Sequence, residues 1–130
     1  MVSSKRMLRL SSAQGKLATM LELKLAMEVQ RIADLDRERA DLAGALEQEG
    51  VASPVARSSA LRRLAQAGEL RTERELNADV LRQQLALARG RQNILERRGD
   101  LLQSEADRRE ETIEGLEAAL EMDRKGSGKR

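Results

Sequence analysis

The sequence predicts an all-α protein, an antiparallel two-helix coiled-coil hairpin whose second helix is the longer one. Three observations predict this fold. The 130 residues include no Phe, Tyr, Trp, His or Cys, although 40% of them are hydrophobic. Ala, Leu, Glu, Arg and Gln dominate the composition, which is typical of long helices rather than of a packed globular core. Apolar residues recur at helical spacing along nearly the whole chain, with one clear interruption beside the only proline, Pro54.

The first helix is predicted over residues 5–49. Ser11 with Gln14 forms a candidate capping box near its start, and Ser4 is a second candidate cap a turn or two earlier. In a heptad register, seven of its nine seam positions are apolar. These positions are Ala18, Leu21, Leu25, Glu28, Ile32, Leu35, Arg39, Leu42 and Leu46.

The interruption lies in EGVASPV, residues 49–55. Gly50 can end a helix in the left-handed conformation, and Ser53 followed by Pro54 is the preferred way to begin one. The sequence therefore predicts a turn at residues 50–53. A connection this short folds two long helices back against each other, so we expect antiparallel pairing.

The second helix is predicted over residues 54–123, with thirteen of eighteen seam positions apolar. Its seam consists of Ala60, Leu64, Ala67, Arg71, Arg74, Ala78, Leu81, Leu85, Ala88, Gln92, Leu95, Gly99, Leu102, Ala106, Arg109, Ile113, Leu116 and Leu120. Many of these residues are alanines, which allow close approach but bury little surface. Glycines inside the helix weaken it further, each by up to about 1 kcal/mol relative to Ala.

Residues 1–123 are thus expected to form a single helical hairpin. The basic end of the chain, RKGSGKR at 124–130, has nothing to bury, and we expect it to be disordered. Pairing outward from the turn leaves the second helix without a partner beyond Gly99. The seam residues proposed to hold the hairpin are Leu21, Leu25, Ile32, Leu35, Leu42, Leu46, Leu64, Leu81, Leu85 and Leu95.

Charge alternates in blocks along the chain, although the formal net charge is only +2. Residues 1–21 carry +4, 22–49 −4, 57–99 +5, 100–123 −7 and 124–130 +4. Blocks of opposite sign favour pairing between segments or between chains over binding to a uniformly negative polymer. We therefore expect protein partners and no nucleic acid. The apolar seam serves a monomer or a dimer equally well, so the oligomeric state stays open.

The absence of His and Cys argues against an enzyme, because imidazole, thiolate and the usual zinc chemistry are missing. No phosphate-binding glycine loop or metal-spaced ligand cluster occurs, so we expect no catalytic residue, no metal and no cofactor. No apolar run approaches the roughly 20 residues that cross a bilayer, and nothing resembles a signal peptide. A cytoplasmic protein is expected.

The segment beyond Gly99 is the candidate partner-binding surface. It combines the acidic block with an apolar stripe that needs a partner or stays exposed. The alternative is a solvated helix end. The candidate partner-binding residues are Leu102, Ile113, Leu116 and Leu120, with the basic pair Arg97 and Arg98.

The whole outline resembles the FliJ family of the flagellar type III export apparatus. The matching features are a basic N-terminus, a leucine-bearing helix containing RIADLDRERADLAGAL, a short turn, and a longer helix ending in ILERRGDLLQSEADRREETIEGLE. Residues 95–112, LERRGDLLQSEADRREET, carry most of the likeness. The chain departs from the family in its missing aromatic residues, so no binding contact is transferred residue by residue.

The resemblance implies a non-enzymatic coiled-coil stalk that couples the hexameric export ATPase to the export gate and handles export chaperones. It also implies a cytoplasmic location, with peripheral association at the inner membrane through the export apparatus. Two alternatives remain: a helical export chaperone or adaptor that uses the stripe beyond Gly99, and a generic structural coiled coil that spaces other proteins.

Overall fold

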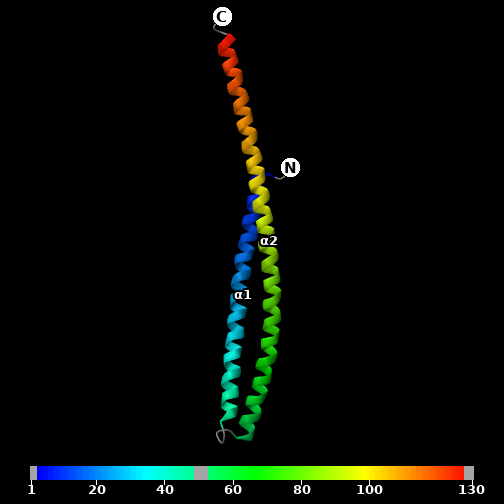
Figure 1. The fold of residues 1–130 in the computed structure, drawn as a ribbon. Coiled ribbons are helices and arrows are strands. Elements are labelled where there is room, and N and C mark those ends of the chain that lie inside the picture. Colours follow the sequence, from blue (N-terminus) through cyan, green and yellow to red (C-terminus); the bar gives the residue numbers. More distant parts are fainter. Residues whose placement is uncertain (1–2, 49–52, 128–130) are drawn as a thin grey trace. The chain divides into compact units, whose positions relative to one another are not determined.

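The computed structural model describes residues 3–48 and 53–127 and contains two helices. Helix α1 spans Ser4–Glu47, and helix α2 spans Pro54–Ser127 (Figure 1). The helices pack against each other in opposite directions, and the described residues contain no strand. The predicted fold class, an antiparallel hairpin with a longer second helix, is confirmed. Most of the predicted turn at 50–53, including Gly50, lies outside the described residues.

Both helices begin at a serine cap. The Ser53 Oγ accepts a hydrogen bond from Ala56 N at 3.2 Å, which confirms Ser53 as the cap ahead of Pro54. At the start of α1 the cap is Ser3, whose Oγ accepts from Arg6 N at 3.2 Å. The expected caps Ser4 and Ser11 are therefore wrong. Ser11 lies inside α1, which begins upstream of it at Ser4, and it is buried.

Helix α2 ends four residues later than the sequence predicts. Residues 124–127 are helical, whereas they were expected to belong to a disordered tail. Arg124 and Lys125 lie in the last turn, where positive charge interacts favourably with the negative end of the helix dipole. Residues 128–130 lie outside the described range.

The described residues group into two units, each containing part of both helices, and unit 2 covers Lys16–Arg89. Its two helices lie side by side (Figure 1). The core of unit 2 is a small cluster built around Leu21 and Leu85, which are 5% and 8% exposed. Ala78 and Ala88 are almost completely buried. Alanines bring the helices close together, so the core is thin.

Unit 1 consists of residues 1–15 and 90–130, and its helices pair through small residues. Gly99 is buried beneath Leu8: a Cβ at this glycine would lie 3.1 Å from Leu8 Cδ2. The Ser4 hydroxyl donates a hydrogen bond to Gln103 Oε1 at 3.1 Å. Pairing thus reaches Gln103 rather than ending at Gly99. The missing side chain at Gly99 allows α1 to approach α2 closely at this level.

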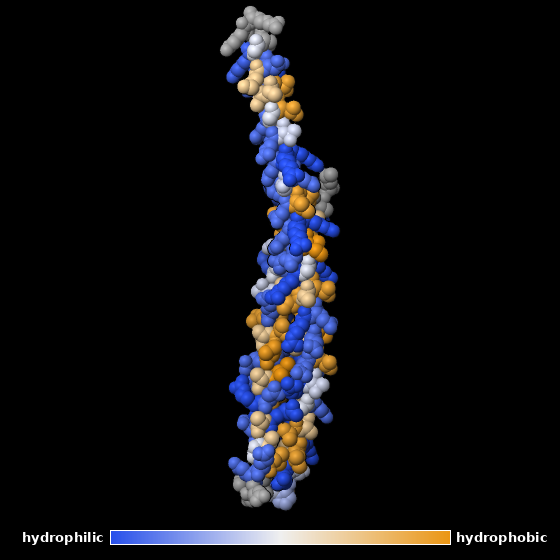
Figure 2. All heavy atoms as spheres, in the orientation of Figure 1, coloured by the Kyte–Doolittle hydropathy of each residue, from blue (hydrophilic) through white to orange (hydrophobic). Residues whose placement is uncertain are grey.

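Charged residues interrupt the apolar pattern of both helices throughout, and they make up 35% of the chain. Figure 2 shows hydrophilic and apolar side chains interspersed over the visible face. Neither described helix contains a stretch that is long and apolar enough to cross a bilayer.

We expect Leu21→Ala to lower the free energy of unfolding by about 2–3 kcal/mol, because it removes a buried side chain from the centre of the core. The matched control is Leu116→Ala, where the side chain is exposed and the change stays within about 0.5 kcal/mol. Urea unfolding followed by far-UV circular dichroism measures both. Equal losses in the two variants would show that the Leu21 cluster does not hold the hairpin together.

Glycine substitutions in α2 test the close contact in unit 1. We expect Gly90→Ala to raise stability by up to about 1 kcal/mol, because a Cβ there meets no atom within 4 Å. Gly99→Ala gains less, since its Cβ would press on Leu8. Thermal unfolding ranks the two variants, and a larger gain from Gly99→Ala would contradict the packing described for Leu8.

Candidate functional site

The C-terminal segment of α2 extends beyond the residues paired with α1. Every described side chain from Gln103 to Gly126 is exposed. Ile113, Leu116 and Leu120, called the C-terminal stripe below, each keep more than half of their surface exposed. Their spacing of three and four residues places them on one side of the helix. The C-terminal stripe is the part of the predicted partner-binding set that the structure leaves open.

Leu102, Arg97 and Arg98 occupy a different environment. Leu102 is half-buried next to Gln103, the residue that accepts the hydrogen bond from Ser4. It therefore belongs to the paired part of unit 1 and not to the exposed stripe. Arg97 and Arg98 are exposed within the same paired part.

The C-terminal stripe lies in an acidic surrounding. Residues 110–123 contain six acidic side chains and no basic one. Figure 2 shows apolar side chains near the C-terminal end of α2, separated by a hydrophilic stretch from the paired part of unit 1. In the sequence, residues 103–112 contain a single apolar residue, Ala106. The segment thus presents an amphipathic helix with an acidic polar face.

All the seam residues proposed to hold the hairpin are buried or half-buried. Leu21 and Leu85 are buried, and the structure brings them together with Leu25 and Leu81 in the core cluster. The remaining seam residues are half-buried: Ile32, Leu35, Leu42, Leu46, Leu64 and Leu95.

A polar layer interrupts the seam of unit 2. Glu28 Oε1 accepts hydrogen bonds from Arg74 Nη1 and Arg31 Nη1, each at 3.2 Å. The Glu28 side chain is only 12% exposed, and these two cations are its ion-pair partners. Glu28 Oε2 and Arg39 Nε are buried without a hydrogen-bond partner among the described residues. The sequence assigned Glu28 and Arg39 to seam positions, but it did not identify Arg74 as the partner of Glu28.

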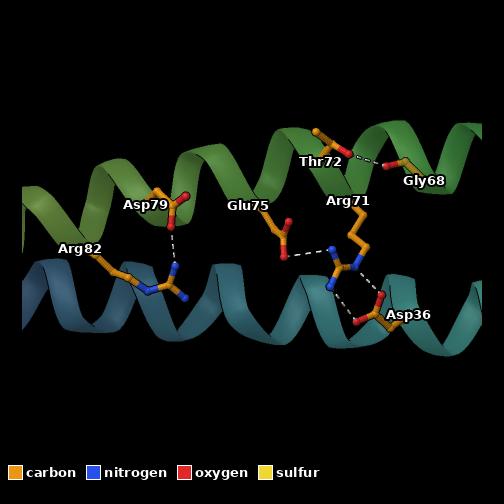
Figure 3. Close-up of polar contacts among 7 residues, drawn as sticks. All are labelled: Asp36, Gly68, Arg71, Thr72, Glu75, Asp79 and Arg82. Carbon is orange, nitrogen blue, oxygen red and sulfur yellow. Dashed lines mark hydrogen bonds and ion pairs between the residues drawn. The ribbon is translucent and has the colours of Figure 1, made fainter.

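A second polar layer surrounds Arg71 (Figure 3). The guanidinium of this seam arginine donates to both carboxylate oxygens of Asp36 and also pairs with Glu75 at 2.9 Å. The hydrogen bond to Asp36 raises the pKa of Arg71 above its ordinary value, and the charges of Asp36 and Glu75 add to the effect. Arg71 links α1 to α2 through its ion pair with Asp36.

The sequence analysis missed an exposed apolar surface on the side of unit 2. Met27 and Val80 line an open groove of about 410 Å³ between the two helices. Met20 and Leu87 lie one heptad away from them, and all four side chains are about half exposed. We call these four residues the lateral face. The signal that could have revealed it is a seven-residue spacing outside the seam, at Val80, Leu87, Ile94 and Leu101.

The chemistry available on these surfaces is that of binding. In the described ranges, no group of three or more acidic side chains is arranged to hold a metal ion. The C-terminal stripe and the lateral face both offer apolar side chains bordered by charge, which is the arrangement that a partner helix recognises.

We expect Arg74→Met to destabilise the hairpin by about 1–3 kcal/mol, because it leaves Glu28 in the seam with Arg31 as its one remaining cation. The double variant Glu28→Leu with Arg74→Leu removes both charges and is expected to be at least as stable as the native chain. Urea unfolding measures the stability of both variants against the native chain. An Arg74→Met variant of native stability would show that the polar layer is not coupled across the seam.

Comparison of the chain with family models, with curated proteins and with solved structures found no match in any of the three. The resemblance to the FliJ family therefore stays a prediction drawn from the sequence pattern.

Proposed function

We propose that the chain is a non-enzymatic coiled-coil component of a flagellar or related type III protein export apparatus, where it couples the export ATPase to the export gate. The proposal combines the resemblance of residues 95–112 to the C-terminal part of the FliJ family with the architecture of the hairpin. Its location is the cytoplasm, with peripheral association at the inner membrane through the export apparatus.

The observation that carries the proposal is the unequal length of the two helices. Helix α1 has 44 residues and α2 has 74, so α2 presents a long segment that is not covered by α1. The paired helices give this segment a fixed base. A coupling protein needs such a combination, because one part must be held while another reaches a partner.

The C-terminal stripe is the proposed contact with that partner. Three exposed aliphatic side chains on one helix face supply the apolar area, and the surrounding acids favour a partner surface with positive charge. Exposed ion pairs contribute only about 0–1 kcal/mol each, so the polar contacts of this surface exchange readily. Readily exchanged contacts suit a component that engages a working ATPase.

A chain without His, Cys or aromatic residues suits a role in which it performs no chemistry. Several of the described charged residues form ion pairs within and between the helices. Examples are Arg63 with Glu38 and Arg89 with Glu22. Such pairs maintain the hairpin as a scaffold.

The test is the rate of ATP hydrolysis by the purified export ATPase that is encoded in the same genome. We expect the native chain to raise this rate. The variant Leu116→Ser with Leu120→Ser is expected to bind the ATPase at least about tenfold more weakly, because it removes apolar contacts worth more than 1.4 kcal/mol together. The matched control is Leu61→Ser with Leu76→Ser, which alters two similarly exposed leucines of unit 2 and keeps the stimulation.

An ATPase that does not respond to the native chain would contradict the coupling role. A one-to-one complex with an export substrate that requires residues 100–123 would then identify a chaperone or adaptor. A chain that forms a dimer and has no effect on the ATPase would instead be a generic structural coiled coil.

A further inference from the structure

The lateral face of unit 2 is an apolar surface that the hairpin itself does not use. Met20, Met27, Val80 and Leu87 are 47%, 50%, 51% and 60% exposed. Met27 and Val80 line one groove. Met20 lies seven residues from Met27 on the same side of α1, and Leu87 lies seven residues from Val80 on the same side of α2. Met27 on α1 and Val80 on α2 therefore border the groove from both helices, and Met20 and Leu87 continue the apolar surface one heptad along each helix.

Two cations border this groove on the α1 side. Lys24 and Arg31 both line it, seven residues apart, and the α2 side contributes the neutral amides of Asn77 and Gln84. Lys24 makes no ion pair with a described residue. Arg31 contacts Glu28, the one acid in the groove lining, but Glu28 is also held by Arg74. The groove therefore combines apolar walls with positive charge.

The C-terminal stripe has the complementary character. Glu110 and Glu117 each precede a stripe residue by three positions, so they lie beside Ile113 and Leu120 on the same helix face. These two acids are also seven residues apart, which corresponds to about 10.5 Å along a helix axis. The spacing between the two acids beside the stripe thus equals the spacing between the two cations beside the groove.

We propose that the C-terminal stripe of one copy docks onto the lateral face of unit 2 of a second copy. Ile113, Leu116 and Leu120 then lie in the groove between the exposed methionines of α1 and the valine and leucine of α2. Glu110 and Glu117 face Lys24 and Arg31, and this charge pairing sets the register.

A second copy of the chain carries the acidic stripe that complements the cations beside the groove. Symmetric alternatives are disfavoured by charge. Two lateral faces would bring Lys24 and Arg31 of each copy together, and two C-terminal segments would oppose six acids with six acids. The contact is therefore head-to-tail, and such contacts extend into open chains or rings of copies.

This inference concerns the protein alone and goes beyond the proposed coupling role. The self-contact covers the same stripe that is proposed to bind the ATPase, so the two contacts exclude each other. In the self-associated protein the C-terminal stripe is covered. The ATPase must therefore displace the second copy before it can bind the stripe.

Analytical ultracentrifugation of the full chain tests the proposal. We expect the average mass to rise above 14.5 kDa with increasing concentration at low salt, and to fall back at high salt because screening weakens the ion pairs. A chain that stays at the monomer mass under all these conditions would overturn the proposal.

Charge reversal identifies the surfaces. Lys24→Glu with Arg31→Glu, and separately Glu110→Lys with Glu117→Lys, are each expected to abolish association, because like charges then meet in the contact. Mixing the two variants restores it, since each tail now meets a groove of opposite sign. The control Arg57→Glu with Arg62→Glu makes the same change in net charge as the Lys24 and Arg31 reversal, on an exposed part of α2, and keeps association.

Far-UV circular dichroism verifies that each variant keeps its helix content. Because Arg31 also contacts Glu28, Lys24→Glu alone and Leu87→Ser alone provide variants that leave the polar layer intact, and each is expected to weaken association. Association that survives both charge reversals, or a mixture that stays monomeric, would overturn the head-to-tail contact. The measurement contains no ATPase, so its outcome is separate from that of the coupling test.

Discussion

The seam between the two antiparallel helices is the constraint on which the rest of the structure depends. Without aromatic residues, the seam has nothing larger than Leu or Met to bury, and much of its α2 side is alanine. Close approach through Ala78, Ala88 and Gly99 compensates in part, because it lets the leucines of α1 reach the opposite helix. A seam this thin buries few side chains completely, so many apolar residues of both helices stay half exposed.

The same thin seam explains the charged residues inside it. Glu28 with Arg74, and Arg71 with Asp36 and Glu75, occupy levels where a larger core would exclude water and make charges costly. The side chains of these pairs are partly exposed. They therefore contact solvent as well as their ion-pair partners. A shift of one helix along the other would separate the pairs, so the polar layers select one register.

Unequal helix length and the shallow seam together create the two surfaces that we interpret functionally. The C-terminal stripe exists because α2 continues past the residues that α1 can cover. The lateral face exists because the seam needs only two positions in every seven, and a third apolar position on each helix lies outside it. One surface is acidic and the other carries basic residues, which makes the two complementary between copies.

The sequence alone determined the fold and the seam. Every proposed seam position from Ala18 to Leu46 and from Ala60 to Leu102 is buried or half-buried, because a heptad repeat specifies which side of a helix meets its partner. Ser53 and Pro54 likewise marked the start of α2 through purely local chemistry. Only the tertiary structure decided the contacts of Gly99 with Leu8, of Ser4 with Gln103 and of Arg71 with Asp36. These depend on the level at which two helices pair, and a periodic pattern on one helix is compatible with many levels.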